Sequence, residues 1–227
     1  MVHPNETPRP SESPVDGGLS LPTDLQGFPP RQQQLHRKTF SIALAQLQEE
    51  DENSLNLQAR LLIREQKDLG VQFTLQALSQ LQPPVSEECL TDVEFAVKTA
   101  LDEIFNNLLD HDLLGYSDGQ RKQASEEEID DKIRQNLNQT LRVDIEISPD
   151  TISLRSHLHS PFDDFDARWA SADPNREMTE EEILANLEKD HGRGLIFIRG
   201  SFPQAVYDRE NRVITFLKPL DPKAEAA

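Results

Sequence analysis

The chain has 227 residues, of which 36% are hydrophobic, and 41 acidic residues outnumber 23 basic ones, for a formal net charge of −18. Its mean hydropathy of −0.63 is low for a fully folded chain, so we expect part of the length to be unfolded. The acidity argues against direct nucleic-acid binding. No apolar run is long enough to cross a membrane, and the polar start argues against a signal peptide. The single cysteine, Cys89, excludes an internal disulfide, and we expect a cytoplasmic protein.

Composition divides the chain into three parts. Residues 1–38 are rich in proline and predict a disordered tail, 39–220 predict one folded domain, and 221–227 a short second tail. The acidic excess lies in two segments: 86–131 has 14 acids and 3 bases, and 160–190 has 10 acids and 3 bases. Either segment suits a basic protein partner, although acidity also serves solubility.

The first half of the domain predicts a strand and then helices. Thr39 to Leu44 favours a strand, and 54–69 favours a helix that ends at Gly70, whereas 71–81 fits either. A second helix is predicted after Pro83 and Pro84, with a capping box at Thr91 and Glu94 and apolar residues at helical spacing up to Leu108. Gly115 to Gly119 predicts a loop, and 120–131 a polar, exposed segment.

The second half predicts two hairpins with helices between them. Residues 141–147 alternate as a strand does, and 151–158 return as a second strand. A helix with a capping box at Thr179 and Glu182 is predicted to end before Gly192, and 195–201 to form a short helix. Strands at 205–207 and 212–217 complete an α/β two-layer sandwich, whose mixed, mostly antiparallel sheet is covered by helices on one face.

Three polar residues of the second predicted helix lie four residues apart: Glu103, Asn107 and His111. At about 100° per residue, His111 falls inside the apolar face and Asn107 at its margin. Polar groups beside a core need partners. Either Asn107 and His111 bond to nearby backbone, or the glutamate and the amide face a ligand, Glu103 as a base and Asn107 as a Mg²⁺ ligand.

A glycine pair, Gly192-Arg193-Gly194-Leu195, precedes the short helix, where backbone N–H groups can approach an anion. The order of motifs along the chain resembles that of the anti-sigma-factor serine kinases of the histidine-kinase-like (GHKL) ATPases. This order is Glu103, Asn107, a hairpin, Ser160-Pro161-Phe162-Asp163, an acidic segment and the glycine pair. The resemblance covers about residues 86–220. It implies the Bergerat ATPase fold.

The resemblance also implies roles. Glu103 matches the general base, and Asn107 the residue that holds Mg²⁺ and the phosphates of ATP. The remaining nucleotide contacts match Pro161, Phe162, Asp163 and the Gly192–Leu195 backbone, with His111 and His157 as further candidates and 164–191 as a lid. The implied function is an ATP-binding regulator, which in its catalytic form is a protein serine kinase. Its implied partner is a sigma factor or an antagonist of the anti-sigma factor. Family members often form homodimers.

One stretch departs from the family. Where the family has Asp-x-Gly before Pro-Phe-Asp, this chain has His157-Leu158-His159, and an imidazole cannot reproduce a carboxylate that accepts from the adenine amino group. An alternative expectation is therefore a nucleotide-independent interaction module on the same fold, whose acidic surface binds a basic protein. In a third hypothesis, His157 and His159, on one side of a strand, ligate a metal together with His111 or Asp163.

Overall fold

The computed structural model describes residues 35–48, 53–81, 85–117, 119–173 and 194–220. The strands are β1 (His36–Ala43), β2 (Thr140–Ile147), β3 (Thr151–His157), β4 (Gln204–Asp208) and β5 (Val213–Pro219). The main helices are α1 (Leu55–Ser79), α2 (Glu87–Asn107), α4 (Glu126–Gln135), α5 (Phe165–Ser171) and α7 (Gly194–Ser201). Shorter helical turns are η2 (Leu44–Gln46), η3 (Leu108–Leu113) and α3 (Gln120–Gln123).

The strands form one five-stranded sheet in the order β1-β2-β3-β5-β4. Every neighbouring pair is antiparallel, so the sheet is antiparallel throughout rather than mixed. Both hairpins that the alternating pattern predicts are present, β2 with β3 and β4 with β5.

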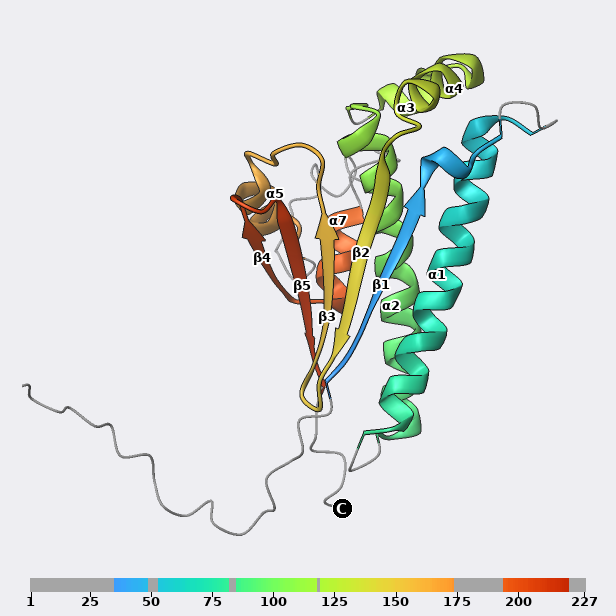
Figure 1. Cartoon of the computed structure of the whole chain (residues 1–227). Helices are drawn as coiled ribbons and strands as arrows, with labels where there is room; N and C mark the ends of the chain where they lie inside the picture. Colours follow the sequence, from blue (N-terminus) through green and yellow to red (C-terminus); the bar gives the residue numbers. More distant parts are fainter. Residues whose placement is uncertain (1–34, 49–52, 82–84, 118, 174–193, 221–227) are drawn as a thin grey trace, which may run out of the picture. The chain divides into compact units, whose positions relative to one another are not determined.

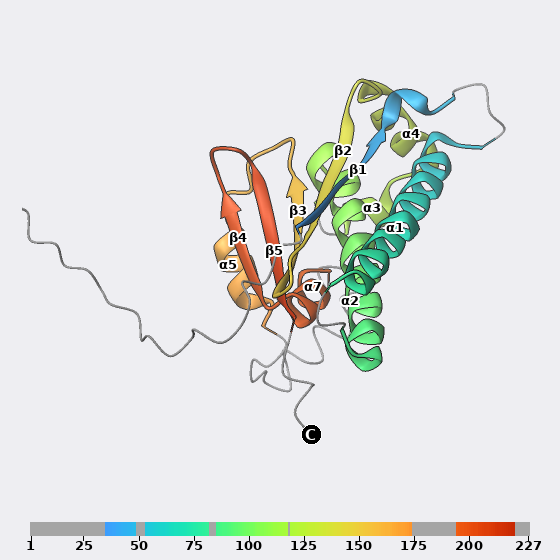
Figure 2. The ribbon, with the colours of Figure 1, turned by 60° about the horizontal axis from the view of Figure 1, so that its bottom comes forward.

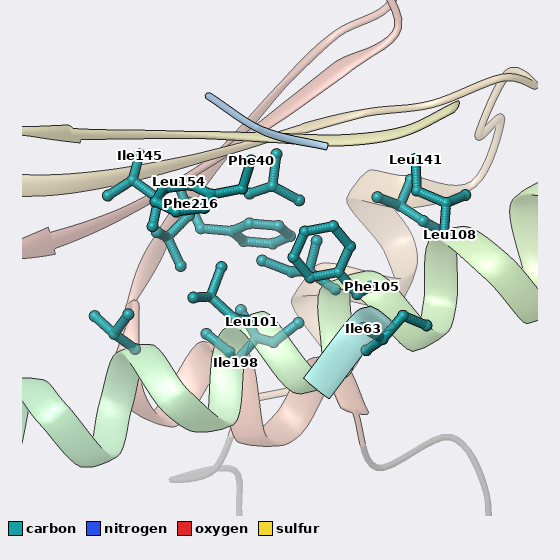
Figure 3. Packing of buried hydrophobic residues seen from close by; sticks show 14 of the residues in the cluster. Phe40, Ile63, Leu101, Phe105, Leu108, Leu141, Ile145, Leu154, Ile198 and Phe216 are labelled. Carbon is teal, nitrogen blue, oxygen red and sulfur yellow. The ribbon is translucent and has the colours of Figure 1, made fainter. Parts of the chain in front are cut away.

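Helices α1, α2 and α7 lie together against one face of the sheet (Figures 1 and 2). Alternate strand residues point toward them, and in Figure 3 Ile145, Leu154 and Phe216 face Leu101 of α2 and Ile198 of α7. Each of these five side chains is at most 2% exposed. The two-layer α/β sandwich predicted from the sequence is confirmed, and its core lies between the layers.

Helix α1 does not end at Gly70 as the sequence predicted, but continues to Ser79. A β-carbon added at Gly70 would lie 2.6 Å from Leu101 Cδ1 and 3.2 Å from Ile145 Cδ1. The glycine therefore permits a close approach of α1 to α2 and β2, and it does not stop the helix. The ambiguous residues that follow it are helical.

Helix α2 begins five residues earlier than predicted, since its N-cap is Ser86 and not Thr91. Ser86 is its N-cap and accepts a hydrogen bond from the Cys89 amide, whereas Thr91 lies inside the helix and bonds back to the Glu87 carbonyl. The capping box predicted at Thr91 and Glu94 is wrong, because a serine that stands just before the helix satisfies the free amides first.

The segment predicted to be polar and exposed is partly buried. It forms α3 and α4, and Ile129 and Ile133 of α4 are at most 2% exposed. They lie four residues apart, so they share one face of α4, and α4 packs near α1. The Glu126-Glu127-Glu128 run is exposed at the N-terminus of α4, which favours negative charge.

Several predictions lie outside the described residues. These are most of the 1–38 tail, the helix between Thr179 and Gly192, and the 221–227 tail. Among the described helices, none combines the length and apolar composition that a membrane span requires.

Candidate functional site

Glu103 and Asn107 lie one turn apart on α2, and both are half-buried. The N-terminal end of α7 packs directly on them: a β-carbon added at Gly194 would lie 2.4 Å from Glu103 Oε2 and 3.4 Å from Asn107 Nδ2. Two motifs that stand almost ninety residues apart in the sequence therefore meet at one place.

Burial of α7 against the core explains this meeting. Ile198, one turn after Gly194, is 1% exposed and points into the core beside Leu101 (Figure 3). With Ile198 anchored there, the start of α7 falls over the next turn of α2. A larger residue at position 194 would push the helix away from Glu103, so the site requires glycine for its close approach rather than for a special backbone angle.

The Glu103 carboxyl group has a perturbed acidity. Partial burial raises its pKa above 4.5, the neighbouring Asp102 carboxylate raises it further, and His111 opposes both. A carboxylate with a raised pKa holds a proton closer to neutral pH, which is the property that a general base needs. The start of α7 also offers backbone N–H groups, which have no partner within the helix and favour an anion.

His111 does not join this group as the helical spacing predicted. The α-helix ends at Asn107, and Leu108–Leu113 form a π-helical turn. Because a π-helix has more residues per turn, the side chains after Leu108 leave the positions that α-helical spacing predicts. Leu109 joins Leu108 in the core, and His111 is exposed. Its Nδ1 lies 2.7 Å from the Tyr116 carbonyl oxygen, as the alternative with backbone partners predicted.

His157 lies on the opposite side of the sheet from Glu103. It belongs to β3, where Leu154 faces the helices, and its Nε2 lies 2.9 Å from Asp144 Oδ2. Asp144 is 1% exposed and also accepts from Thr39 Oγ1 at 2.7 Å and from Arg142. Burial opposes its ionisation, but the hydrogen bonds from Thr39 and His157 and the nearby positive charges lower its pKa to about 2. Strand alternation thus removes His157 from the side of the sheet where Asn107 lies.

His159 is held by Asp112 of η3. The Asp112 carboxylate lies 2.8 Å from His159 Nδ1 and accepts from the backbone amides of His159 at 2.7 Å and Ser160 at 2.8 Å. The hydrogen bond to Asp112 raises the pKa of His159, against the effect of burial. These bonds attach the chain after β3 to the end of the α2–η3 unit, so His159 has a structural partner.

The hypothesis of a metal held by His157 and His159 is wrong for this arrangement, because the two imidazoles bind different carboxylates in different parts of the molecule. Within the described residues, no three His, Cys, Asp or Glu side chains are placed to hold a metal ion. A Mg²⁺ ion at Asn107 is a separate prediction, since such an ion takes most of its ligands from phosphates and water.

The Pro161-Phe162-Asp163 stretch lies beside β4. Pro161 and Asp163 are exposed, whereas the Phe162 amide donates to Tyr207 Oη at 3.0 Å, and its ring packs edge-on against Phe165 at 5.6 Å. Phe165 in turn stacks on Trp169 of α5. Leu195 packs against the core, and Gly192 and Arg193 lie outside the described residues.

Two residues that organise this region escaped the sequence analysis, Asp112 and Asp144. Asp144 carried no usable signal, because it stands on the polar side of an alternating strand, where the pattern predicts an exposed acid. Asp112 carried none, since its partners at 159 and 160 are distant in sequence. Comparison with known proteins adds no family: no protein-family model matches this chain, and no curated protein is detectably similar to it.

Proposed function

We propose that this chain is a nucleotide-binding regulator of the anti-sigma-factor kinase type, which binds ATP with Mg²⁺ and acts through a protein partner in the cytoplasm. The observation that carries the proposal is the contact of Gly194 with Glu103 and Asn107. The predicted base, the predicted Mg²⁺ ligand and the predicted phosphate-binding backbone meet there.

The residues at this place suit the phosphate end of a nucleotide. Backbone N–H groups of 194 and 195 bind phosphate oxygens at the helix start. The Asn107 side-chain carbonyl oxygen is a ligand that Mg²⁺ accepts. The bound ATP would supply the phosphoryl group, with Mg²⁺ offsetting its charge.

Glu103 would take the proton from a serine hydroxyl of the partner protein, which the raised pKa favours. In the structure its carboxylate lies against the start of α7, the position that a phosphate would take. Binding of the nucleotide therefore requires the Glu103 side chain to turn away from Gly194, because two anions repel at this distance.

The base end of the nucleotide fits less well. His157 is bonded to Asp144 on the other face and His159 to Asp112, so neither imidazole stands where the family holds adenine. We therefore propose that affinity comes chiefly from the phosphates.

The poor fit of His157 and His159 to adenine favours a second candidate function, an interaction module that needs no nucleotide. In it the acidic surfaces, such as the exposed Glu126-Glu127-Glu128 run, bind a basic protein. This module binds its partner equally well with and without ATP, and salt weakens the complex.

Calorimetric titration of ATP and ADP with Mg²⁺ into the full chain tests the proposal. We expect binding in the micromolar range, and we expect Asn107→Ala to abolish it while the circular dichroism spectrum stays unchanged. The matched control is Asn138→Ala, since Asn138 is exposed and precedes β2. Equal affinity in wild type and Asn107→Ala contradicts the proposed site, and absence of binding by a folded wild-type chain favours the interaction module.

A further inference from the structure

The face of the sheet that points away from the helices carries its own pattern of side chains. Cross-strand pairing places them in three rows that run from β1 to β4. The first row is Arg37, Glu146, Ser153, Leu217 and Gln204, the second is Thr39, Asp144, Arg155, Thr215 and Val206, and the third is Ser41, Arg142, His157, Val213 and Asp208. We call this surface the open face, since none of the described helices covers it (Figures 1 and 2).

The β1–β2–β3 half of the open face is basic. Three arginines stand there with two acids. The arginines are Arg37, Arg142 and Arg155, and the acids are Asp144 and Glu146. In a chain of net charge −18, this half has the opposite sign to the whole. At physiological ionic strength charges beyond about 8 Å are screened, so the local sign decides what binds here.

The arginines keep donors for another molecule. Arg155 Nη2 lies 3.6 Å from Glu146 Oε2 and Arg37 Nε lies 3.9 Å from the same atom, both too long for hydrogen bonds. Arg37 is 50% and Arg142 is 46% exposed. A guanidinium has five N–H donors in a planar fork, so these side chains can bind carboxylates of a partner without giving up their contacts to Asp144.

The β5–β4 half of the open face carries an aliphatic patch, which lies between Gln204 at one end and Asp208 at the other. Val206 is 61% exposed, and Val213 and Leu217 are half-buried, with Thr215 between them. The open face therefore has an aliphatic patch on one side and, in each of its three rows, one arginine on the other side. A segment with aliphatic side chains along one edge and carboxylates along the other complements this arrangement.

We propose that the open face is a docking surface for an acidic amphipathic segment of a partner protein, whose aliphatic side chains cover Val206, Val213 and Leu217 and whose carboxylates pair with Arg37 and Arg155. Asp144 and Glu146 pair with the arginines, so the excess of positive charge on this face is small. A small excess suits one or two carboxylates and is too little for a phosphate backbone, which requires many cationic contacts. This surface lies on the opposite layer from Gly194, so the inference is independent of nucleotide binding.

The test is a titration of the ¹⁵N-labelled full chain with a synthetic helical peptide of about 18 residues made of leucine, alanine and glutamate in an amphipathic pattern. We expect amide shifts on β3, β4 and β5, such as those of Arg155 and Val206, and weaker binding as salt increases. Arg155→Gln and Val206→Ser should each weaken binding, the former about tenfold. Both side chains are exposed enough for the variants to fold.

The control variant is Arg209→Gln, which removes the same charge from the β4–β5 turn, where Arg209 pairs with Asp166; it should bind as wild type does. The proposal fails if the peptide shifts only amides of the helix layer, if a peptide with lysine in place of glutamate binds equally well, or if both open-face variants bind unchanged. Shifts of the same amides with protein concentration alone would also overturn it, because a second copy of the chain would then be the occupant.

Discussion

Asp144 offers the sharpest test of what holds the sheet together. It is 1% exposed, and its carboxylate accepts from Thr39 and Arg142 and contacts His157. Replacement by asparagine keeps the size but turns one acceptor oxygen into an NH₂ donor. The NH₂ group then faces other donors, and at least one of them loses its partner.

The structure sets the magnitude. The carboxyl group has a pKa of about 2 in the folded chain against an ordinary value of 3.8, and each pKa unit corresponds to about 1.4 kcal/mol. The ionised group therefore contributes about 2.5 kcal/mol to the free energy of unfolding at pH 7. Because the folded pKa is the lower one, this contribution is complete well above pH 3.8, falls to about half near pH 3, and disappears below pH 2.

The contribution of Asp144 to the free energy of unfolding is measured by urea unfolding of wild type and Asp144→Asn, followed by circular dichroism at pH 7 and pH 3. We expect the variant to be less stable by about 2.5 kcal/mol at pH 7 and by about 1.3 kcal/mol at pH 3. Asp166→Asn serves as the control, since Asp166 is 76% exposed and should lose well under about 1 kcal/mol. A loss at Asp144 that is equal at the two pH values would refute the role of the ionised carboxylate.

Further predictions concern two glycines and two acids, each checked by the same unfolding measurement. Gly70→Ala should destabilise the chain by about 1–2 kcal/mol, because overpacking against Leu101 outweighs the gain in helix propensity. Gly200→Ala should stabilise it by about 0.5–1 kcal/mol, because the added β-carbon meets no atom within 4 Å. If Gly70→Ala is the more stable of the two variants, the packing described for Gly70 is wrong. Glu103→Gln should be more stable than wild type at pH 7 and as stable as wild type near pH 4. The pKa of Glu103 is raised in the folded chain, so wild type loses stability as the pH rises through that pKa. The glutamine variant has no proton to lose there and keeps its stability. Asp112→Ala should destabilise by about 2–3 kcal/mol through three lost hydrogen bonds, and an unchanged midpoint would show that the bonds to 159 and 160 carry no stability.

Local pattern predicted most of the elements. The first hairpin and the second helix were predicted from patterns of neighbouring residues, the alternation at 141–147 and 151–158 and the apolar spacing up to Leu108. The strands and the helix formed where these patterns indicated. The errors came where a residue has two possible roles. Gly70 ends a helix by propensity, but here it permits contact between packed elements.

The site divides in the same way. The presence of Glu103, Asn107 and the glycine pair was readable from residue type and spacing, and so was the two-layer fold that brings α7 beside α2. The position of His111, away from Glu103 and Asn107, could not be predicted in this way. The π-helical turn at Leu108–Leu113 rotates the side chains that follow it, whereas a prediction from helical spacing assumes a constant number of residues per turn.

The direction of His157 depended on the register of β2 and β3, which places it beside Arg142 and next to a buried carboxylate. Sequence alone determined the order of elements and the chemical types available, since these follow from local backbone preference and periodicity. Tertiary structure decided which groups meet, Gly194 with Glu103 and Asp144 with His157. Such contacts join residues from separate elements, and only packing of the whole core sets their distances and faces.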